Sequence, residues 1–195
     1  MKKGVEVIKD TERAKVLVDP MRREILRLLA ERPMTENGLA EALGLSDPSV
    51  GHHLKILTRS GLVRIARKEV EQHGIVQKFY ATNSLVYFID DHGMPLEIVR
   101  YFMPVHLERA RAIIAALSAL NGEFGEVRAE DLEEFARILN SVVVKVAPRY
   151  SKQWKGNSEE VANRIYRDAL IHLLEKPDVL PEKLRTLFFR ARKTR

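Results

Sequence analysis

Cysteine is absent from this chain of 195 residues. The absence excludes disulfide bonds, zinc sites built from thiolates and catalysis by a cysteine nucleophile. Long apolar runs are also missing: the stretch 112–117 is far shorter than the roughly 20 residues that a helix needs to cross a bilayer. The basic first residues are followed by acidic ones and not by an apolar signal core. We therefore expect a cytoplasmic protein that does not contact a membrane.

Catalytic and metal-binding patterns are missing as well. We find no nucleophile, base and orienting residue at a suggestive spacing, no phosphate-binding glycine loop and no zinc pattern. His92, His106 and His172 are scattered, and the adjacent His52 and His53 would point apart on a helix. We expect no enzyme, no cofactor and no metal site.

Positive charge is what the chain has in excess. Its 33 Lys and Arg residues outnumber its 27 Asp and Glu residues, which gives a formal net charge of +6. This balance fits an anionic partner such as nucleic acid, although many proteins without such a partner share it. The excess is concentrated between residues 46 and 80, where six Lys or Arg residues face three Asp or Glu residues.

Hydrophobic periodicity and capping signals predict three helices in the first part of the chain. Asp19 before Pro20 should cap the first clear helix, and Thr35 should cap a short second one. Ser46 or Asp47 should cap the third, and the pattern does not choose between them. Gly44 and Gly61 then fit the ends of the second and third helices.

A hairpin is predicted next, with strands at 62–70 and 75–82 and a turn at 71–74. Alternation places Val63 and Ile65 on one side of this hairpin, and Arg64 and Lys68 on the other. Three helices and a hairpin in this order predict a winged helix-turn-helix over residues 14–83.

The rest of the chain is predicted to be helical, at 105–121, at 129–147, from 157 to 176 and from 181 onward, whereas 85–103 has no clean period and stays open. The predicted fold class is mainly α (α+β). A DNA-binding domain at 1–83 precedes a helical C-terminal domain at 84–195, which would serve dimerisation and offer room for an effector. Core packing is the favoured role of the aromatic residues Tyr87, Phe88, Tyr101 and Phe102, ahead of lining a ligand pocket. The basic end of the chain is favoured as a solvated helix end over a phosphate contact; it contains Lys183, Arg185, Arg190, Arg192, Lys193 and Arg195.

The third predicted helix has a buried and an exposed side. Helical spacing turns Val50, His53, Leu54 and Leu57 toward the protein, with His53 expected as a packed, hydrogen-bonded core histidine. Short and polar residues early on the other side suit base edges, and cations further along suit phosphates. With the wing cations added, the predicted DNA contacts are Ser46, Ser49, Gly51, His52, Lys55, Arg59, Arg64, Arg67, Lys68, His73 and Lys78. Gly51 is expected to let the helix backbone approach the DNA closely.

Five short stretches at these places, in this order and spacing, resemble the ArsR-type winged-helix regulators; they are 19–26, 39–46, 49–57, 60–63 and 78–80. The resemblance covers roughly 70 residues and points to an archaeal-type member with a long helical C-terminal extension. It implies a homodimer that binds an operator, usually to repress. It gives the base contacts to Ser49, Gly51 and His52, and the backbone contacts to the wing cations.

The chain departs from this family where many members sense metals. The start of the second helix, at 34–38, carries no cysteine, and we find no paired Asp and His residues of the kind that form the family's other metal site. The chain also continues for over a hundred residues beyond the wing, where compact members end. An effector therefore cannot be inherited from the resemblance, and a small-molecule effector of unidentified kind stays open.

The function predicted from the sequence is a sequence-specific DNA-binding transcriptional regulator, a repressor, that binds a palindromic operator of double-stranded DNA as a homodimer. Its two recognition helices would lie in successive major grooves roughly 34 Å apart. The alternative is a winged-helix module for protein–protein interaction that does not read bases.

Overall fold

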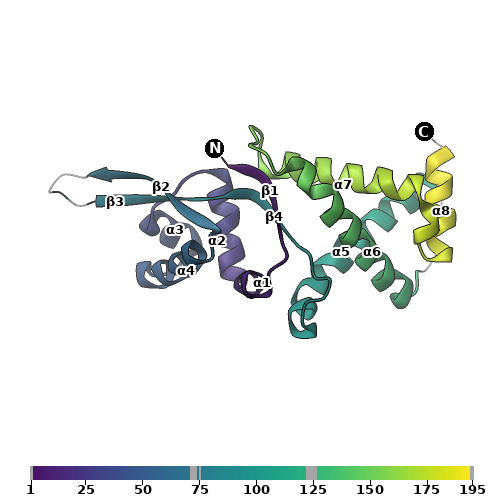
Figure 1. The fold of residues 1–195 in the computed structure, drawn as a ribbon, viewed down its shortest axis with the longest axis horizontal. Helices are drawn as coiled ribbons and strands as arrows, with labels where there is room; N and C mark the ends of the chain where they lie inside the picture. Colours follow the sequence, from purple (N-terminus) through teal and green to yellow (C-terminus); the bar gives the residue numbers. More distant parts are fainter. Residues whose placement is uncertain (1, 71–73, 75, 122–126, 194–195) are drawn as a thin grey trace. The chain divides into compact units, whose positions relative to one another are not determined.

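The computed structural model describes residues 2–70, 74, 76–121 and 127–193 (Figure 1). These residues form two units. The first comprises Met1–Phe88 and Arg149–Ala162, and the second comprises Ile89–Pro148 and Asn163–Arg195. The predicted fold class, a winged helix-turn-helix with an all-helical C-terminal part, is confirmed. No helix of the described residues is long and apolar enough to cross a membrane.

The first unit contains the winged helix. Its elements are β1 (Lys3–Ile8), α1 (Thr11–Val18), α2 (Pro20–Glu31), α3 (Glu36–Leu43), α4 (Asp47–Arg59), β2 (Val63–Val70), β3 (Val76–Thr82) and β4 (Ser84–Ile89). The buried residues of α2, α3 and α4 include Ile25, Leu39 and Leu54, each at most 2% exposed, so these helices share one core.

The predicted caps explain where the helices begin. The Asp19 carboxylate accepts hydrogen bonds from the backbone N–H groups of Met21, at 2.8 Å, and Arg22, at 3.1 Å. Thr35 Oγ1 accepts one from Gly38 N at 3.0 Å, which fixes the start of α3. Helix α4 begins at Asp47, so Ser46 is its N-cap residue, although the Ser46 side chain makes no capping hydrogen bond.

The wing is an antiparallel hairpin of β2 and β3, in which Val63 pairs with Thr82 and Ile65 with Tyr80. The register then shifts, so that Arg67 and not Ala66 pairs with Phe79. Such a bulge reverses the alternation of side chains beyond it. Arg64 and Lys68 pair with Ala81 and Lys78, which are three residues apart, so they lie on opposite sides and the prediction that they share a side is wrong. Val63 and Ile65 precede the bulge and lie on one side as predicted, although Val63 is 2% exposed and Ile65 is 40% exposed.

Strands β1 and β4 were not predicted from the sequence. They pair with each other, and residues of β4 are buried on both faces, which explains why this stretch shows no clean period. Strand β1 is also bonded to a distant segment, because Gly4 N donates to Lys152 O at 2.9 Å and Trp154 N donates to Lys2 O at 3.2 Å. The first unit is thus larger than the 1–83 range expected for the DNA-binding domain.

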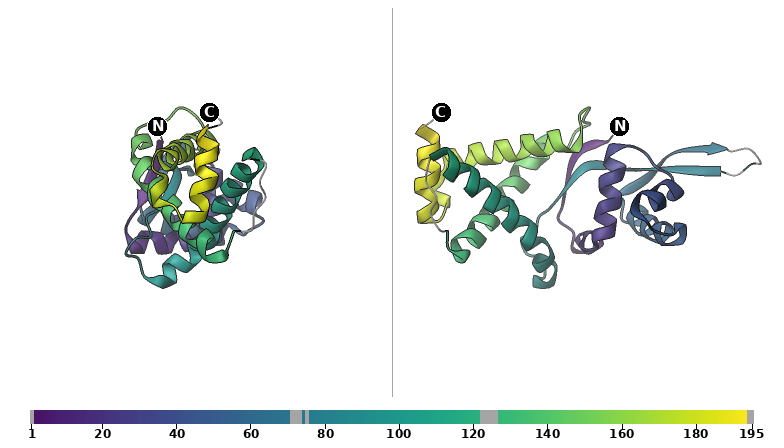
Figure 2. Two further views of the ribbon diagram at one scale, coloured as in Figure 1. Left: turned by 90° about the vertical axis from the view of Figure 1, so that its right-hand side faces the viewer. Right: turned by 180° about the vertical axis from the view of Figure 1, so that it is seen from behind.

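The second unit is helical and includes α5 (Leu96–Asn121), α6 (Ala129–Val146), most of α7 (Ser158–Glu175) and α8 (Glu182–Lys193). Short 3₁₀ turns lie at Ala147–Tyr150 and Pro177–Val179. Helix α5 packs against α6 and α8 (Figure 2). In the core of this unit the rings of Phe135 and Phe188 meet edge to face, with centroids 5.5 Å apart.

Helix α5 starts at Leu96 and not at the expected residue 105, and Pro104 lies inside it without ending it. A proline inside a helix removes one backbone hydrogen bond, but packing on both sides of it can preserve the helix. Buried residues on both sides, Phe102 and His106, supply that packing here. The other predicted helices match α6, α7 and α8 within a few residues, and Asn157 caps α7 by accepting a hydrogen bond from Glu160 N at 2.8 Å.

Candidate nucleic-acid interface

Helix α4 presents one buried and one exposed face, as its periodicity requires. Val50, Leu54 and Leu57 are 0–2% exposed. His52, Lys55 and Arg59 are exposed and lie three and four residues apart, so they form one polar and basic stripe on the opposite side. A stripe of this kind on a packed helix has the shape and the chemistry of a recognition helix that enters the major groove.

The first turn of α4 carries three short polar residues beside this stripe. Ser46 and Asp47 are exposed, and Ser49 is half-buried. Unpaired N–H groups at a helix start attract phosphate. The Asp47 carboxylate opposes phosphate but can accept a hydrogen bond from the amino group of cytosine. Asp47 was not among the predicted contacts, because on sequence alone its role was limited to capping the helix.

Gly51 also lies close to a side chain of α3. A Cβ atom at this position would lie 2.5 Å from Glu36 Oε1. The missing side chain therefore makes room for a carboxylate of α3 next to α4. The obstacle is the end of a flexible side chain, so a small residue here would displace Glu36 and leave the backbone in place.

His53 is packed as expected, with its side chain 16% exposed, but the predicted hydrogen bond is wrong. Its Nδ1 atom lies 3.9 Å from Asp19 Oδ2, which is too long for a hydrogen bond, and no acceptor is within reach.

Partial burial alone would raise the pKa of Asp19. The backbone N–H of Arg22 and the charges of Arg22 and His53 outweigh this effect and lower that pKa.

The wing cations fall into two groups. Lys68 and Lys78 are exposed and directly opposite each other on the two strands. Arg67 is engaged locally: its Nε donates to Glu69 Oε1 at 2.6 Å, and its guanidinium lies 3.9 Å from the centroid of the Phe79 ring. The lysine pair is therefore the stronger candidate for a phosphate contact.

The remaining predicted wing contacts are less available or lie outside the description. Arg64 is half-buried, and its Nη1 donates to Thr82 O at 3.2 Å at the base of the wing. His73 lies outside the described residues. Arg64 thus holds the base of the wing in position.

A groove of about 290 Å³ runs between the wing and the first turns of α3 and α4. Two backbone hydrogen bonds between Met34 and Tyr80, of 3.0 and 2.8 Å, hold the wing to the chain just before α3. Burial, and then the charge of Glu36, raise the pKa of Tyr80. The groove is lined by Thr35, Glu36, Asn37, Asp47, Val76, Gln77, Lys78 and Tyr80. Sequence reasoning missed it because its residues come from three segments that only the folded chain brings together.

A buried hydrogen-bond network fixes the base of the wing. The Thr82 hydroxyl lies 2.9 Å from the hydroxyl of Tyr87 and 2.9 Å from the carbonyl of Ser84. The Tyr87 hydroxyl also donates to Leu62 O at 2.9 Å. Burial raises the pKa of Tyr87. This side chain is therefore a structural element of the first unit and not part of a ligand pocket.

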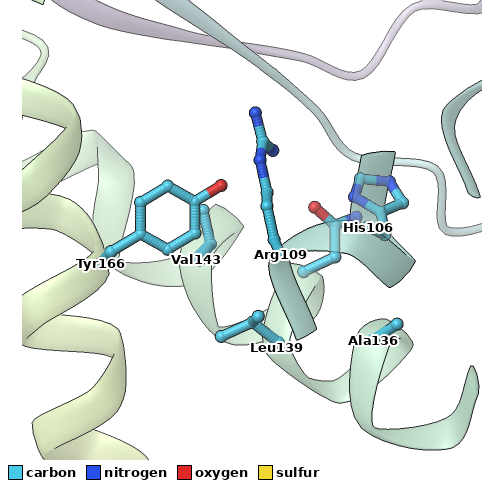
Figure 3. Close-up of a pocket in the computed structure, with 7 residues that line it drawn as sticks. His106, Arg109, Ala136, Leu139, Val143 and Tyr166 are labelled. Carbon is cyan, nitrogen blue, oxygen red and sulfur yellow. The ribbon is translucent and has the colours of Figure 1, made fainter. Parts of the chain in front are cut away.

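The second unit contains a small polar cavity, shown in Figure 3. Its volume is about 10 Å³, enough for roughly one water molecule and too little for an organic effector. His106 and Arg109 of α5, Asn140 of α6 and Tyr166 of α7 line it together with aliphatic side chains. Burial raises the pKa of Tyr166 to about 12, and it lowers the pKa of His106, whose Nε2 atom has no hydrogen-bond partner.

Helices α3 and α4, joined at Gly44 and followed by the β2–β3 hairpin, form a winged helix-turn-helix, a fold class that includes many transcriptional regulators. Residues 19–64 match the family model described as bacterial regulatory protein, arsR family, so this part of the chain is an ArsR-family helix-turn-helix domain. The resemblance inferred from the sequence is confirmed.

One curated relative is the transcriptional repressor SdpR of Bacillus subtilis (strain 168), which is 43% identical over 54 residues. The aligned part covers 28% of this chain and 60% of SdpR, so the chain spans about 60% of the length of that relative.

The chain is also similar to parts of three solved structures. Reduced HlyU from Vibrio cholerae N16961 is 28% identical and has a TM-score of 0.30, covering 37% of this chain and 75% of HlyU. Rv0081 from M. tuberculosis is 23% identical, with a TM-score of 0.32 and coverage of 56% and 89%. The homodimeric winged helix-turn-helix fragment of Mb0332 from Mycobacterium bovis is 20% identical, with a TM-score of 0.33 and coverage of 60% and 86%.

Proposed function

We propose that this protein is a transcriptional repressor that binds a palindromic operator as a homodimer, with α4 in the major groove. One observation carries the proposal: His52, Lys55 and Arg59 form a single exposed stripe on a helix whose other face is buried in the core of an ArsR-family domain. His52 is placed to meet base edges, and Lys55 and Arg59 to meet phosphates. The relative SdpR is a transcriptional repressor, which supports repression as the sign of regulation.

Two lysines of the wing support a DNA contact, because their mutual repulsion lowers the stability of the free protein. Like charges directly opposite each other in a hairpin destabilise it, and Lys68 and Lys78 are such a pair. A phosphate between the two ammonium groups would remove this repulsion. We therefore assign the backbone contact of the wing first to Lys68 and Lys78, and only second to Arg64 and Arg67, whose guanidinium groups already have partners in the free protein.

The test is fluorescence anisotropy of a labelled fragment of the gene's own upstream DNA, beside a scrambled duplex, at two salt concentrations. We expect preferential binding that weakens with salt. His52→Ala should lower the preference for the native fragment by roughly tenfold, since one base contact is worth about 1–3 kcal/mol. Lys68→Ala with Lys78→Ala should weaken binding to both duplexes and make the salt dependence shallower.

Lys145→Ala is the matched control, because Lys145 is an exposed lysine of α6 in the second unit. It should change neither affinity nor salt dependence. Equal binding of the two duplexes, or an effect of Lys145→Ala as large as that of the wing variants, would contradict sequence-specific reading by α4. Folded protein that binds no DNA at low salt would favour the protein-interaction alternative.

A further inference from the structure

The carboxyl end of helix α4 has more hydrogen-bond acceptors than the helix itself can pair. The last carbonyl groups of a helix have no partner within it. Here the backbone N–H of Gly61, at φ 70°, donates to Thr58 O at 3.1 Å. The backbone N–H of Leu62 donates to Leu57 O at 2.9 Å, which completes the turn that is usual at such a helix end. The carbonyl groups of Ser60 and Gly61 lie beyond this turn and need partners from elsewhere.

Two side chains from outside α4 are these partners. Arg13 of α1 donates from Nε to Ser60 O at 3.1 Å. Asn83, between β3 and β4, donates from Nδ2 to Gly61 O at 2.7 Å. The guanidinium group at this end also faces the partial negative charge of the helix dipole. The carboxyl end of α4 is therefore tied to α1 and to the base of the wing.

Arg13 is itself held by a carboxylate of β1. Its Nη1 donates to Glu6 Oε1 at 2.7 Å, and the other oxygen of Glu6 accepts a hydrogen bond from Ser84 Oγ of β4 at 3.3 Å. The guanidinium group is planar and rigid, so a bond that fixes Nη1 also fixes the direction of Nε. Glu6 thus aims Arg13 at the end of α4. Residues 6, 13 and 84 lie outside the range 19–64 that matches the family model, so the resemblance assigns them no role.

The amino end of α4 is held differently. Ser46, its N-cap residue, makes no capping hydrogen bond through its side chain. This half of the helix is held by apolar packing, in which Val50 and Leu54 are at most 2% exposed. Apolar contacts have no preferred direction, whereas hydrogen bonds do. The directional contacts of Arg13 and Asn83 therefore act at the carboxyl end of α4.

The length of α4 makes its carboxyl end important for base reading at its other end. His52 precedes Ser60 by eight residues, which is about 12 Å along the helix axis. A tilt of about 5° around the carboxyl end would move His52 by about 1 Å, whereas a binding site needs its groups held within about 0.5 Å. Lys55 and Arg59 have long side chains and lie nearer the fixed end, so they would still reach phosphates.

We propose that Arg13, held by Glu6, is a positioning residue for DNA reading: it fixes the tilt of α4 and thereby the place of His52 in the major groove. The inference rests on the proposed function, in which α4 reads bases. It adds a residue that acts through α4 and makes no contact with DNA.

The first test is the effect of Arg13→Met on base discrimination. Methionine keeps a long side chain but has no hydrogen-bond donor. In the anisotropy assay, affinity for the native upstream fragment should fall roughly tenfold, the scale of one lost base contact. Affinity for the scrambled duplex and the salt dependence of binding should stay as in the wild type, because the phosphate contacts remain. The ratio of the two affinities is the readout, since a purely structural role of Arg13 would lower both affinities together.

Variants of Glu6 test whether this residue acts through Arg13. Glu6→Leu leaves Arg13 without its anchor and should lower the affinity ratio roughly threefold, the scale of one hydrogen bond. Glu6→Gln keeps an oxygen that can accept from Arg13 Nη1 and should restore the ratio of the wild type. The double variant of Arg13→Met with Glu6→Leu should resemble Arg13→Met alone, because one contact can be lost only once. A double variant that loses the product of the two single effects would reject the role of Glu6.

Arg27→Met is the matched control. Arg27 of α2 is an exposed arginine that also donates to carboxylates, Glu24 Oε1 at 2.9 Å and Glu31 Oε1 at 2.8 Å, but both lie on its own helix. This variant should keep the affinity ratio of the wild type. Circular dichroism at the assay temperature verifies that each variant is folded. Should Arg13→Met not fold, Arg13→Lys takes its place: its single nitrogen cannot fill the positions of both Nε and Nη1, so the ratio should fall roughly threefold.

The outcomes separate this inference from the proposed function. If the wild type discriminates between the duplexes and the folded Arg13 variant keeps the same ratio, the positioning role is rejected and the repressor stands. A loss that is equal for both duplexes, with a salt dependence shallower by about one phosphate contact, would identify Arg13 as a direct DNA contact and also reject the positioning role. A wild-type protein that does not discriminate rejects the proposed function, and the positioning role falls with it.

Discussion

One buried polar residue of each unit, Thr82 in the first and His106 in the second, can be compared by its hydrogen-bond partners. In the first unit the fully buried Thr82 hydroxyl lies within hydrogen-bond distance of three groups, and Tyr87 joins this wing residue to Leu62, just before β2. In the second unit Nε2 of the buried His106 lies 3.6 Å from Asp91 Oδ2 and has no hydrogen-bond partner. Asn140 Nδ2 donates to the other carboxylate oxygen of Asp91. A satisfied network fixes one arrangement, whereas an unsatisfied group lowers stability and leaves a site that responds to protons.

The largest expected effect separates the stability of the two units. Phe135→Ala removes a fully buried ring and its contact with Phe188, and should destabilise the second unit by about 3–5 kcal/mol. Trp154, the single tryptophan, belongs to the first unit. We expect helix loss by circular dichroism at a lower urea concentration, while Trp154 fluorescence changes at its wild-type midpoint. Coincident shifts of both signals would show that the units unfold as one.

The next effect probes the satisfied network. Thr82→Val keeps the shape of the side chain but removes the hydroxyl that Tyr87 and the Ser84 carbonyl face. Leaving such groups unpaired should cost about 1–3 kcal/mol, measured by urea unfolding followed through Trp154. Thr58→Val on the exposed face of α4 is the matched control. It should cost less than about 0.5 kcal/mol, as surface substitutions usually do. Equal costs would mean that the network does not stabilise the first unit.

A pH effect probes the unsatisfied histidine. Burial lowers the pKa of His106, the charge of Asp91 opposes this effect and the charge of Arg109 adds to it. The unfolded chain therefore takes up a proton more readily than the folded chain does. The stability that neutral His106 contributes is lost as the pH falls from near 6.5, the ordinary pKa of histidine, toward the lower pKa of His106 in the folded state. The melting temperature of the second unit should fall between pH 7.5 and 5.5, and the fall should be smaller in His106→Leu. An equal fall in both proteins would assign the pH dependence to other groups.

The smallest effect concerns the wing, where stability and function should change in opposite directions. Lys68→Gln removes the repulsion with Lys78 and should stabilise the hairpin by about 0.2–1 kcal/mol. The same change should weaken DNA binding and lower the salt dependence by about one phosphate contact. Thermal unfolding and anisotropy measured on one preparation test both signs. Lower stability together with unchanged DNA binding would show that the lysine pair has no role in binding.

Both units were predictable where their signals are local. Asp19, Thr35 and Gly44 determine where helices begin and end through contacts within a few residues, and these predictions held. Strand β4 escaped because burial on both faces removes the alternation that identifies a strand. The bulge between Ile65 and Arg67 was not predicted, because one extra residue in a strand does not change its composition.

The candidate site was predictable in its exposed part and not in its packing. Helical spacing alone separates His52, Lys55 and Arg59 from the buried residues of α4. The room that Gly51 leaves for Glu36, the stacking of Arg67 on Phe79 and the groove beside Lys78 depend on residues from other segments. No period within α4 or the wing carries that information.

The backbone bonds of β1 also have a consequence for the order in which the protein is made. Residues 152–154, which bond to the N-terminal strand, leave the ribosome about 150 residues after it, or roughly 8–30 s later at common rates of synthesis. In the second half of that interval α1 to α4 and the wing have already been synthesised, while one edge of β1 stays unpaired. The nascent chain thus contains α4 and the wing before it contains the segment that closes the same unit.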